Sequence, residues 1–586
     1  MDSPTNIFDI PKQETQAPAV LAKLKPRAMQ LWVDALPMTN LRATTRAVFA
    51  RIETLITSEL PSATLLDSLE ILVARCHVIV AQLEERIRDK ARPLAVEDLR
   101  IADLIYELRL KVYLGYKRVL HETRGERGAR RLLHRMARRR AFHRAQEVLL
   151  ELLRNRCLIY RPVPYFHWLE MHDNFEQACA EKCHAKPMQL IDNGGIRLST
   201  EDLYKQALLF ALASPHRFLP RDIQRLYLAL RRWAGDCVIE RMGPQVDMDR
   251  APFFVDINLD KPPVHISAVD MSKPFAGWYI HTSGLVSRVA SEMEAAEKAR
   301  GGEMRSRPTN RLDVLPLSLL SSLLLAWGMG TRRQVQRTQS QRSLRIIAGI
   351  SDLYTLLGGI PLPDGNNSAG FEMEVVGTFG GPKAQPAELH WHEELAEFEI
   401  SVGGREGFGN VRIRSFLMCD ASNGGMLICA DDASESDVHV GELIGILDDP
   451  QARTISRIGA VRWMRLDRQN RQQCGVELLL HDPRCSQLRV SRKDGMVEYL
   501  PVIYQLPDDG QDNLLLITEC FYAKPSDSFC WRFEGEEQPL SLSQLLECTG
   551  AYSLFQLPLD SIGDDTDSRR RDVHPADYFD DIWNRL

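Results

Sequence analysis

Apolar residues recur at steps of three and four positions through most of the first half of the chain. Leu65, Leu69, Leu72 and Cys76 have this spacing, which places the four side chains on one face of an α-helix. Pro, Gly and charged clusters interrupt the pattern, so several helices are expected rather than one. The pattern predicts a helical bundle or irregular solenoid over residues 31–243, preceded by a flexible N-terminus at residues 1–30.

The periodicity changes after residue 243. Phe253–Leu259 alternates apolar and polar positions like a β-strand, and Ser287–Arg300 reads as a charged helix. We therefore expect a small α/β segment at residues 244–310. Residues 311–404 should then contain an apolar junction helix, a group of arginines, and an insertion rich in Gly, Pro and Asn.

Short apolar or alternating runs dominate the chain beyond residue 404, and turn residues separate them. The clearest expected strands are Val411–Cys419, Gly425–Ala430, Leu443–Leu447, Ile458–Met464, Gly475–Leu480, Tyr499–Tyr504 and Asn513–Phe521. Their spacing is typical of an antiparallel β-barrel, which we expect within residues 405–559 together with a C-terminal extension. Residues 560–586 should form an acidic linker and a short terminal helix. The predicted fold class is multidomain α + β.

Composition argues against several classes of partner. The chain has 586 residues and a net charge of −6, so it has no overall basic excess of the kind that attracts nucleic acid. The longest apolar run, Val314–Trp327, is too short to span a membrane. The twelve cysteines lie mostly in apolar runs, which favours free thiols in a reducing compartment. Because the first residues do not form a secretion signal, we expect a cytoplasmic protein.

The segment Asp420–Gly425, with the sequence Asp-Ala-Ser-Asn-Gly-Gly, is the first candidate binding site. Alone, it supports two interpretations, because the same residue types build tight turns for purely structural reasons. The segments after it favour binding. They are Val440-Gly441-Glu442-Leu443-Ile444, then Gly459-Ala460-Val461-Arg462-Trp463, then Gly475-Val476-Glu477-Leu478.

In this order and at these distances, the four segments resemble those of PilZ domains, most closely between Val411 and Leu480. The resemblance implies a PilZ-like β-barrel that binds the bacterial second messenger cyclic di-GMP through Asp420, Ser422 and Gly425. The carboxylate can accept hydrogen bonds from guanine, the hydroxyl can bond to phosphate or base, and glycine lets the backbone approach closely.

PilZ sites also contain an arginine pair with the spacing R-x-x-x-R. Arg333 and Arg337 have this spacing, with Arg332 beside them. Guanidinium groups suit the ligand because they stack on guanine and donate two hydrogen bonds to its O6 and N7 atoms. However, Arg337 and Asp420 are farther apart in sequence than in simple PilZ domains. Either an insertion folds out between them, or the arginines belong to a basic helix end after Trp327.

Other candidate sites are weaker. The arginine-rich stretch Arg124–Arg156 suits a solvated or protein-contact face better than a nucleic-acid surface, because aromatic side chains are nearly absent from it. Cys179, Cys183 and His390–Glu394 do not have the ligand pairs of a metal site, so neither a metal nor another cofactor is expected. The chain has no recognisable catalytic motif, so we expect a receptor and no enzyme.

The leading hypothesis is a cyclic di-GMP receptor that signals to a protein partner through its helical region or through Tyr578–Leu586. Ligand binding would reorder the junction between Trp327 and Arg345. The rival hypothesis is a protein-interaction scaffold with a degenerate PilZ barrel that does not bind the ligand. The long sequence separation of Arg337 from Asp420 is its main support.

Overall fold

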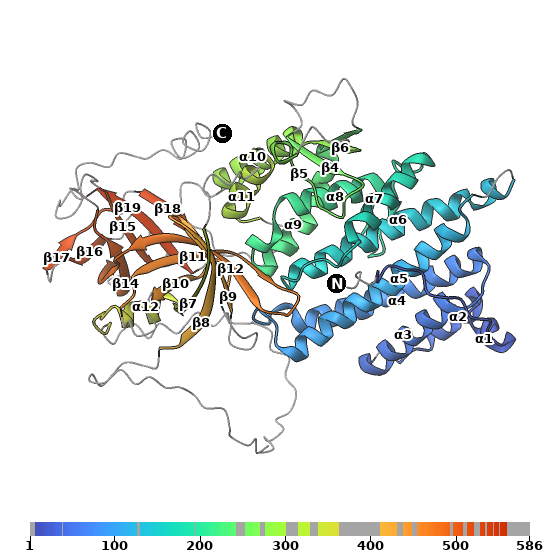
Figure 1. The fold of residues 1–586 in the computed structure, drawn as a ribbon, viewed down its shortest axis with the longest axis horizontal. Helices are drawn as coiled ribbons and strands as arrows, with labels where there is room; N and C mark the ends of the chain where they lie inside the picture. The colour runs from blue at the N-terminus through green and yellow to red at the C-terminus, as the bar shows by residue number, and fades with distance from the viewer. Residues whose placement is uncertain are drawn as a thin grey trace, which may run out of the picture.

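The computed structural model describes residues 6–362 and 411–558, apart from short gaps. The gaps are residues 38, 126–128, 193, 242–251, 270–275, 300–314, 329–337, 431–437, 448–453, 493–495, 508–512, 521–527, 534–535, 543 and 550. Figure 1 shows two halves side by side, with helices from the first part of the chain on the right and β-strands from the last part on the left. The predicted α + β fold class, with a helical region first and a β-barrel later, is confirmed.

Helices make up nearly all of the first half. They are α1 (Pro18–Lys23), α2 (Pro26–Asp34), α3 (Leu41–Thr57), α4 (Ser62–Arg88), α5 (Val96–Glu122), α6 (Ala129–Leu158), α7 (His167–Ala180), α8 (Thr200–Leu212) and α9 (Pro220–Trp233). A short strand pair, β1 (Met188–Gln189) and β2 (Arg197–Leu198), connects α7 to α8. The apolar stripe expected on α4 faces inward, since Leu65, Leu69 and Leu72 are completely buried. The 3-10 helix η1 (Pro215–Arg217) precedes α9.

The arginine-rich stretch Arg124–Arg156 lies largely on α6, and it is not simply a solvated or protein-contact face. Arg138 is buried and donates from Nε to Glu181 Oε1 at 2.9 Å. Arg154 is also buried and donates from Nη2 to Glu84 Oε1 at 2.6 Å. These side chains hold α6 to its neighbours. The sequence pattern does not reveal this role because an arginine stem is long enough to reach a partner on another helix.

Three histidines lie in the helical core. His143, His167 and His172 have no exposed surface. Burial is the main cause that lowers their pKa values, to about 4 for His143, about 3 for His167 and about 4 for His172. In an unfolded chain, a histidine titrates near a pKa of about 6.5. The three rings are therefore neutral in the folded protein at a pH where the unfolded chain is already protonated.

Stability is expected to fall as the pH drops from about 6.5 to about 4, because the unfolded state then binds protons that the folded state excludes. Each histidine contributes a slope of up to about 1.4 kcal/mol per pH unit. Denaturant unfolding of the full chain across this interval measures the slope. His167→Leu should make this slope shallower. An unchanged slope in that variant would contradict this account.

A small sheet and two helices follow the helical region. The strands are β3 (Val238–Arg241), β4 (Phe253–Asp256), β5 (Val264–His265) and β6 (Gly277–His281), in the order β3-β6-β4-β5. The helices are α10 (Ser283–Ala299) and α11 (Leu317–Gly328). Trp327, near the end of α11, is completely buried and donates from Nε1 to Leu209 O at 3.1 Å. Its own carbonyl accepts from Thr282 Oγ1 at 2.6 Å. The end of α11 is thus fixed to the helical half.

Six strands close an antiparallel barrel in the order β10-β11-β12-β9-β8-β7. They are β7 (Thr338–Ala348), β8 (Ile413–Ser422), β9 (Gly425–Ala430), β10 (Leu443–Leu447), β11 (Arg457–Leu466) and β12 (Gln472–His481). Strands β8 to β12 lie where the sequence pattern predicts them. Strand β7 lies in the region assigned to the junction, ahead of α12 (Ile350–Leu356). It is hard to recognise from sequence because its first half is polar and mostly exposed.

A separate seven-stranded sheet follows the barrel, where the C-terminal extension was expected. Its order is β17-β16-β13-β14-β15-β19-β18. The strands are β13 (Arg484–Ser491), β14 (Val497–Gln505), β15 (Asn513–Glu519), β16 (Ser528–Phe533), β17 (Glu536–Pro539), β18 (Gln544–Cys548) and β19 (Tyr552–Pro558). Ile347 of the barrel shares an apolar cluster with Ile503 and Ile517 of this sheet. The two β-structures therefore pack on each other.

The hairpin between β11 and β12 contacts the helical half. Leu466 N donates to Tyr160 O at 2.7 Å, and Arg161 Nη2 donates to Asn470 Oδ1 at 2.8 Å. Residues of the helices and of the barrel also belong to one continuous apolar cluster. The barrel is thus attached directly to the helices. Within the described part of the chain, no helix is long and apolar enough to cross a membrane.

Candidate functional site

The register of β7 and β8 brings together two segments that residues 349–412 separate in sequence. Gln339 lies opposite Asp420, and Thr338 lies opposite Ala421. The register shifts between Gln339 and Arg342, which marks a β-bulge or irregularity beside Asp420. Such irregularities bend a strand locally and often redirect side chains near binding sites. The start of β7 is therefore beside the Asp-x-Ser motif.

The segment Asp420–Gly425 forms the hairpin between β8 and β9. Asp420 and Ser422 are half-buried residues at the end of β8, while Asn423 and Gly424 form the exposed two-residue turn. Ser422 pairs with Gly425 across the hairpin, and Ser422 Oγ donates to Gly425 O at 3.1 Å. The turn interpretation is therefore correct for this segment. A structural turn can also bind a ligand. This turn lies next to the start of β7, the strand that directly follows the arginine motif in sequence.

Gly425 has a structural role in the barrel, independent of the expected approach of a ligand. A Cβ atom at this position would lie 2.5 Å from Val476 O on β12. Real Cβ atoms do not approach a carbonyl oxygen so closely, so the neighbouring strand excludes a side chain here. Gly425 thus allows β9 and β12 to pack against each other and holds the hairpin in place.

Arg332, Arg333 and Arg337 lie outside the described residues, so their side chains are not placed. The residues on either side of them are placed. Trp327 is anchored in the helical half, and Thr338 is paired with Ala421 in the barrel. The arginine motif therefore occupies the connection between the two halves of the protein.

Sequence reasoning missed β7 and with it Gln339, the residue opposite Asp420. A signal was present in the alternation of Leu344, Ile346 and Ala348, all of which are buried. This signal covers only the second half of β7, because residues 338–343 are all polar.

Two other motif residues have structural roles in the barrel. A Cβ atom on Gly475 would lie 2.0 Å from Nε1 of Trp463, so the indole covers this glycine. Arg462 donates from Nη2 to Glu547 Oε2 at 2.7 Å and thereby links the barrel to the seven-stranded sheet. Among the side chains that the structure places, no group of three or more His, Cys, Asp or Glu residues is arranged to hold a metal.

Gly475→Ala is expected to destabilise the protein by about 1–3 kcal/mol, because the added methyl group overlaps the indole of Trp463. Gly424→Ala is the matched control, since nothing lies within 4 Å of the Cβ position there. Denaturant unfolding followed by circular dichroism compares the two variants. Trp463→Leu should recover part of the loss in the Gly475→Ala background. Equal stability of the two alanine variants would contradict this explanation.

The chain matches two family models. One, described as the N-terminal domain of the cyclic-di-GMP receptor FimW, matches residues 27–245. The other, described as the middle PilZ domain of the same receptor, matches residues 252–364. The first match contains helices α3 to α9. The second contains β4 to β6, α10, α11, β7 and α12, and it ends before β8.

A relative, the cyclic-di-GMP receptor FimW of Pseudomonas aeruginosa, is 24% identical over 599 aligned positions, which cover 96% of this chain and 96% of the relative. No solved structure matches the chain. The matched family is described as a receptor and not as a class of enzyme. The two family matches, the similarity over almost the whole length and the closed barrel show that this chain belongs to the PilZ-domain proteins of the cyclic di-GMP receptor family, with a long helical region before its barrel.

Proposed function

We propose that this protein is a non-enzymatic receptor that binds cyclic di-GMP where β7 begins, between the arginine motif and the Asp420–Gly425 hairpin. Arg332, Arg333 and Arg337 would bind guanine and phosphate, and Asp420 and Ser422 would bind the base edge or phosphate. The observation that carries the proposal is the pairing of Gln339 with Asp420. This pairing brings Gln339, two positions after Arg337 in sequence, opposite Asp420, and it supports contact of both motifs with one ligand despite their distance in sequence.

Covalent geometry limits how far the two motifs can be separated. Arg337 is bonded to Thr338, so their Cα atoms are about 3.8 Å apart. Thr338 is the partner of Ala421 in an antiparallel ladder, where paired Cα atoms are about 4.5–5.5 Å apart. The described backbone nearest to the arginine motif, at Thr338, is therefore within about 6 Å of the backbone between Asp420 and Ser422. A cyclic dinucleotide with two bases and two phosphates can contact both motifs.

Guanidinium and carboxylate groups complement this ligand. An arginine can stack on the guanine plane and donate two hydrogen bonds to O6 and N7, which a lysine cannot do. Asp420 can accept from the donors on the opposite guanine edge. Isothermal titration of the full chain with cyclic di-GMP tests the proposal, with GMP as the control ligand. Saturable binding of cyclic di-GMP is expected, and absence of binding would remove the proposal.

The place of the arginine motif also suggests how binding is transmitted. The residues before it are fixed to the helices through Trp327, and those after it are fixed to the barrel through Thr338. A ligand that binds both the arginines and the Asp420–Gly425 hairpin would change the path of this connection. The helical region, or Tyr578–Leu586, would then present a changed surface to a protein partner. The proposed place of action is the cytoplasm.

Hydrogen–deuterium exchange tests this transmission. Cyclic di-GMP should slow exchange at residues 338–345 and should also change it at the contact between the halves, where Leu466 N bonds to Tyr160 O. A variant with Asp420→Ala should show neither change. Protection confined to β7 and β8, with no change at residues 159–165 and 466–471, would contradict a response of the helical half.

Isothermal titration with cyclic di-GMP also distinguishes the alternative hypothesis of a protein-interaction scaffold that does not bind the ligand. Its main support was the long sequence separation of Arg337 from Asp420, which the pairing of β7 with β8 spans. It predicts no measurable affinity for cyclic di-GMP in a fully folded chain.

A further inference from the structure

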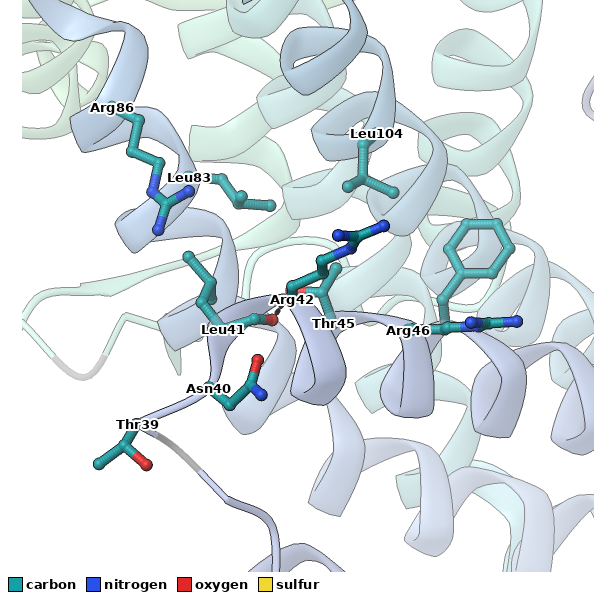
Figure 2. A pocket seen from close by; sticks show the side chains of 10 residues that line it. Thr39, Asn40, Leu41, Arg42, Thr45, Arg46, Leu83, Arg86 and Leu104 are labelled. Carbon is teal, nitrogen blue, oxygen red and sulfur yellow. Dashed lines mark hydrogen bonds between the residues drawn. The ribbon is translucent and has the colours of Figure 1, made fainter. Parts of the chain in front are cut away.

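A second candidate site lies in the helical half, on elements that the proposed cyclic di-GMP site does not use. A cavity of about 790 Å³ opens between the first half of α3, the end of α4 and the first half of α5 (Figure 2). We call it the arginine pocket. Its lining residues are Thr39, Asn40, Leu41, Arg42, Thr45, Arg46, Phe49, Leu83, Arg86 and Leu104. This volume is within the range of about 300–1,000 Å³ that is typical of small-molecule sites.

Positive charge gathers at this pocket without a carboxylate to balance it. Arg42 and Arg46 lie one turn apart on α3, and Arg86 comes from the last turn of α4. No Asp or Glu lines the pocket. Figure 2 shows the side chain of Arg42 extending toward Leu104, while that of Arg86 lies beside Leu83. The three side chains are exposed, so a ligand can reach them from solvent.

These arginines differ from the arginines of the helical half that have carboxylate partners. Arg109, for example, donates to Glu84 and Glu151 at 2.9 and 2.8 Å. In contrast, none of the three pocket arginines forms an ion pair or hydrogen bond with another residue that the structure describes. Unpaired surface arginines are ordinary one at a time. Three of them around one cavity leave a local charge that an anionic ligand can neutralise.

The start of α3 adds to this attraction. Asn40 caps the helix, and its Oδ1 accepts from Ala43 N at 3.0 Å. The first backbone N–H groups of a helix carry a partial positive charge, which favours anions at this end. Both Asn40 and Leu41 line the pocket, so this charge acts in the same space as the guanidinium groups.

The rest of the lining is apolar. Leu41, Leu83 and Leu104 contribute aliphatic surface, and Phe49 contributes an aromatic ring. A bare ion such as phosphate would leave this surface unused. The combination suits a ligand with two parts, one carrying several negative charges and one that is planar or apolar.

We propose that the arginine pocket binds a nucleotide with a chain of phosphate groups, of the nucleoside diphosphate class, and that this site is separate from the barrel site. The guanidinium groups and the start of α3 would bind the phosphates, since guanidinium groups donate paired hydrogen bonds to phosphate oxygens. Phe49 and the leucines would contact the base. The proposal does not depend on cyclic di-GMP binding.

Isothermal titration of the full chain with ADP, pyrophosphate and adenosine tests this site. ADP should bind saturably, pyrophosphate more weakly, and adenosine not measurably. Arg42→Gln and Arg86→Gln should each weaken ADP binding at least about tenfold. Arg27→Gln is the matched control, because Arg27 is an exposed arginine on α2 outside the pocket, and it should bind ADP as the wild type does. Saturating cyclic di-GMP should leave ADP affinity unchanged.

Three results would overturn the proposal. They are no saturable ADP binding at millimolar concentration, equal affinity for adenosine and ADP, and an equal loss in Arg27→Gln and Arg42→Gln. The last would show only a general attraction of anions to a basic surface. Thermal melting followed by circular dichroism checks that the variants fold. Arg42→Lys retains the positive charge but cannot donate paired hydrogen bonds to phosphate, so it shows which of the two properties ADP binding requires. Failure of the barrel site alone would leave ADP binding intact, so the two proposals fail separately.

Discussion

Asp420→Ala is expected to weaken cyclic di-GMP binding by about 10- to 150-fold. In the proposed site, the carboxylate accepts hydrogen bonds from a guanine edge. A hydrogen bond to a charged group contributes about 1.5–3 kcal/mol, and each 1.4 kcal/mol is a factor of about ten in affinity. Arg333→Ala should cause a loss of similar size, because it removes both stacking and a charged hydrogen bond. Isothermal titration measures both losses.

Matched controls separate a lost contact from a damaged barrel. Arg333→Lys retains the positive charge, but a lysine cannot stack on guanine or donate two hydrogen bonds to its O6 and N7 atoms. This variant should therefore also bind cyclic di-GMP weakly. Glu536→Ala removes an exposed carboxylate from β17, in the other sheet, and should bind normally. In a double-mutant cycle, Arg337→Ala and Asp420→Ala should be non-additive, since both groups contact one ligand. Wild-type affinity in Asp420→Ala and Arg333→Ala would refute the proposed site.

Arg109→Met is expected to destabilise the helical half by about 3–5 kcal/mol, because it leaves the buried carboxylate of Glu151 without its cation. Arg109 on α5 is buried and donates from Nη1 to Glu84 Oε1 at 2.9 Å and from Nε to Glu151 Oε2 at 2.8 Å. Arg154 binds the same oxygen of Glu84 at 2.6 Å. Burial alone would raise the pKa of Glu84, but Arg154 and Arg109 lower it to about 2. The network joins α4, α5 and α6.

Denaturant unfolding of the full chain, followed by far-ultraviolet circular dichroism, measures this loss. Arg88→Met is the matched control, since Arg88 and Glu85 form an ion pair on α4 with both side chains more than half exposed. Such exposed pairs contribute at most about 1 kcal/mol. Adding Glu151→Leu to Arg109→Met should recover stability, because it removes an unpaired buried charge. A loss in Arg109→Met no larger than in Arg88→Met would contradict this account of the core.

Local sequence patterns predict those helices and strands in which the residues nearby in sequence already indicate which side chains are buried. The three- and four-residue apolar period of α4 places Leu65, Leu69 and Leu72 in the core. Strands β8 to β12 alternate or are continuously apolar, so their positions are also predictable. Strand β7 is different, because its polar first half gives no periodic signal. Its place in the barrel depends on pairing with β8 and β10, which are distant in sequence.

The candidate site shows the same division. Sequence alone identifies the Asp420–Gly425 motif and the arginine spacing, because both depend on residue types at short separations. It cannot decide whether the two motifs meet. The structure adds a packing role for Gly425, which leaves room for Val476 O on the neighbouring strand. It also shows that buried arginines of α6 hold helices together, a role set by partners on other helices.

The sequence by itself therefore determined the helical first half, most of the barrel strands and the resemblance to PilZ domains, since these follow from local periodicity and short motifs. Only the tertiary structure decided that β7 completes the barrel and that Gln339 lies opposite Asp420. It alone brought Arg42, Arg46 and Arg86 to one cavity. The physical reason is that strand register and helix contacts are fixed by how the whole chain buries its apolar surface, which no short window of sequence contains.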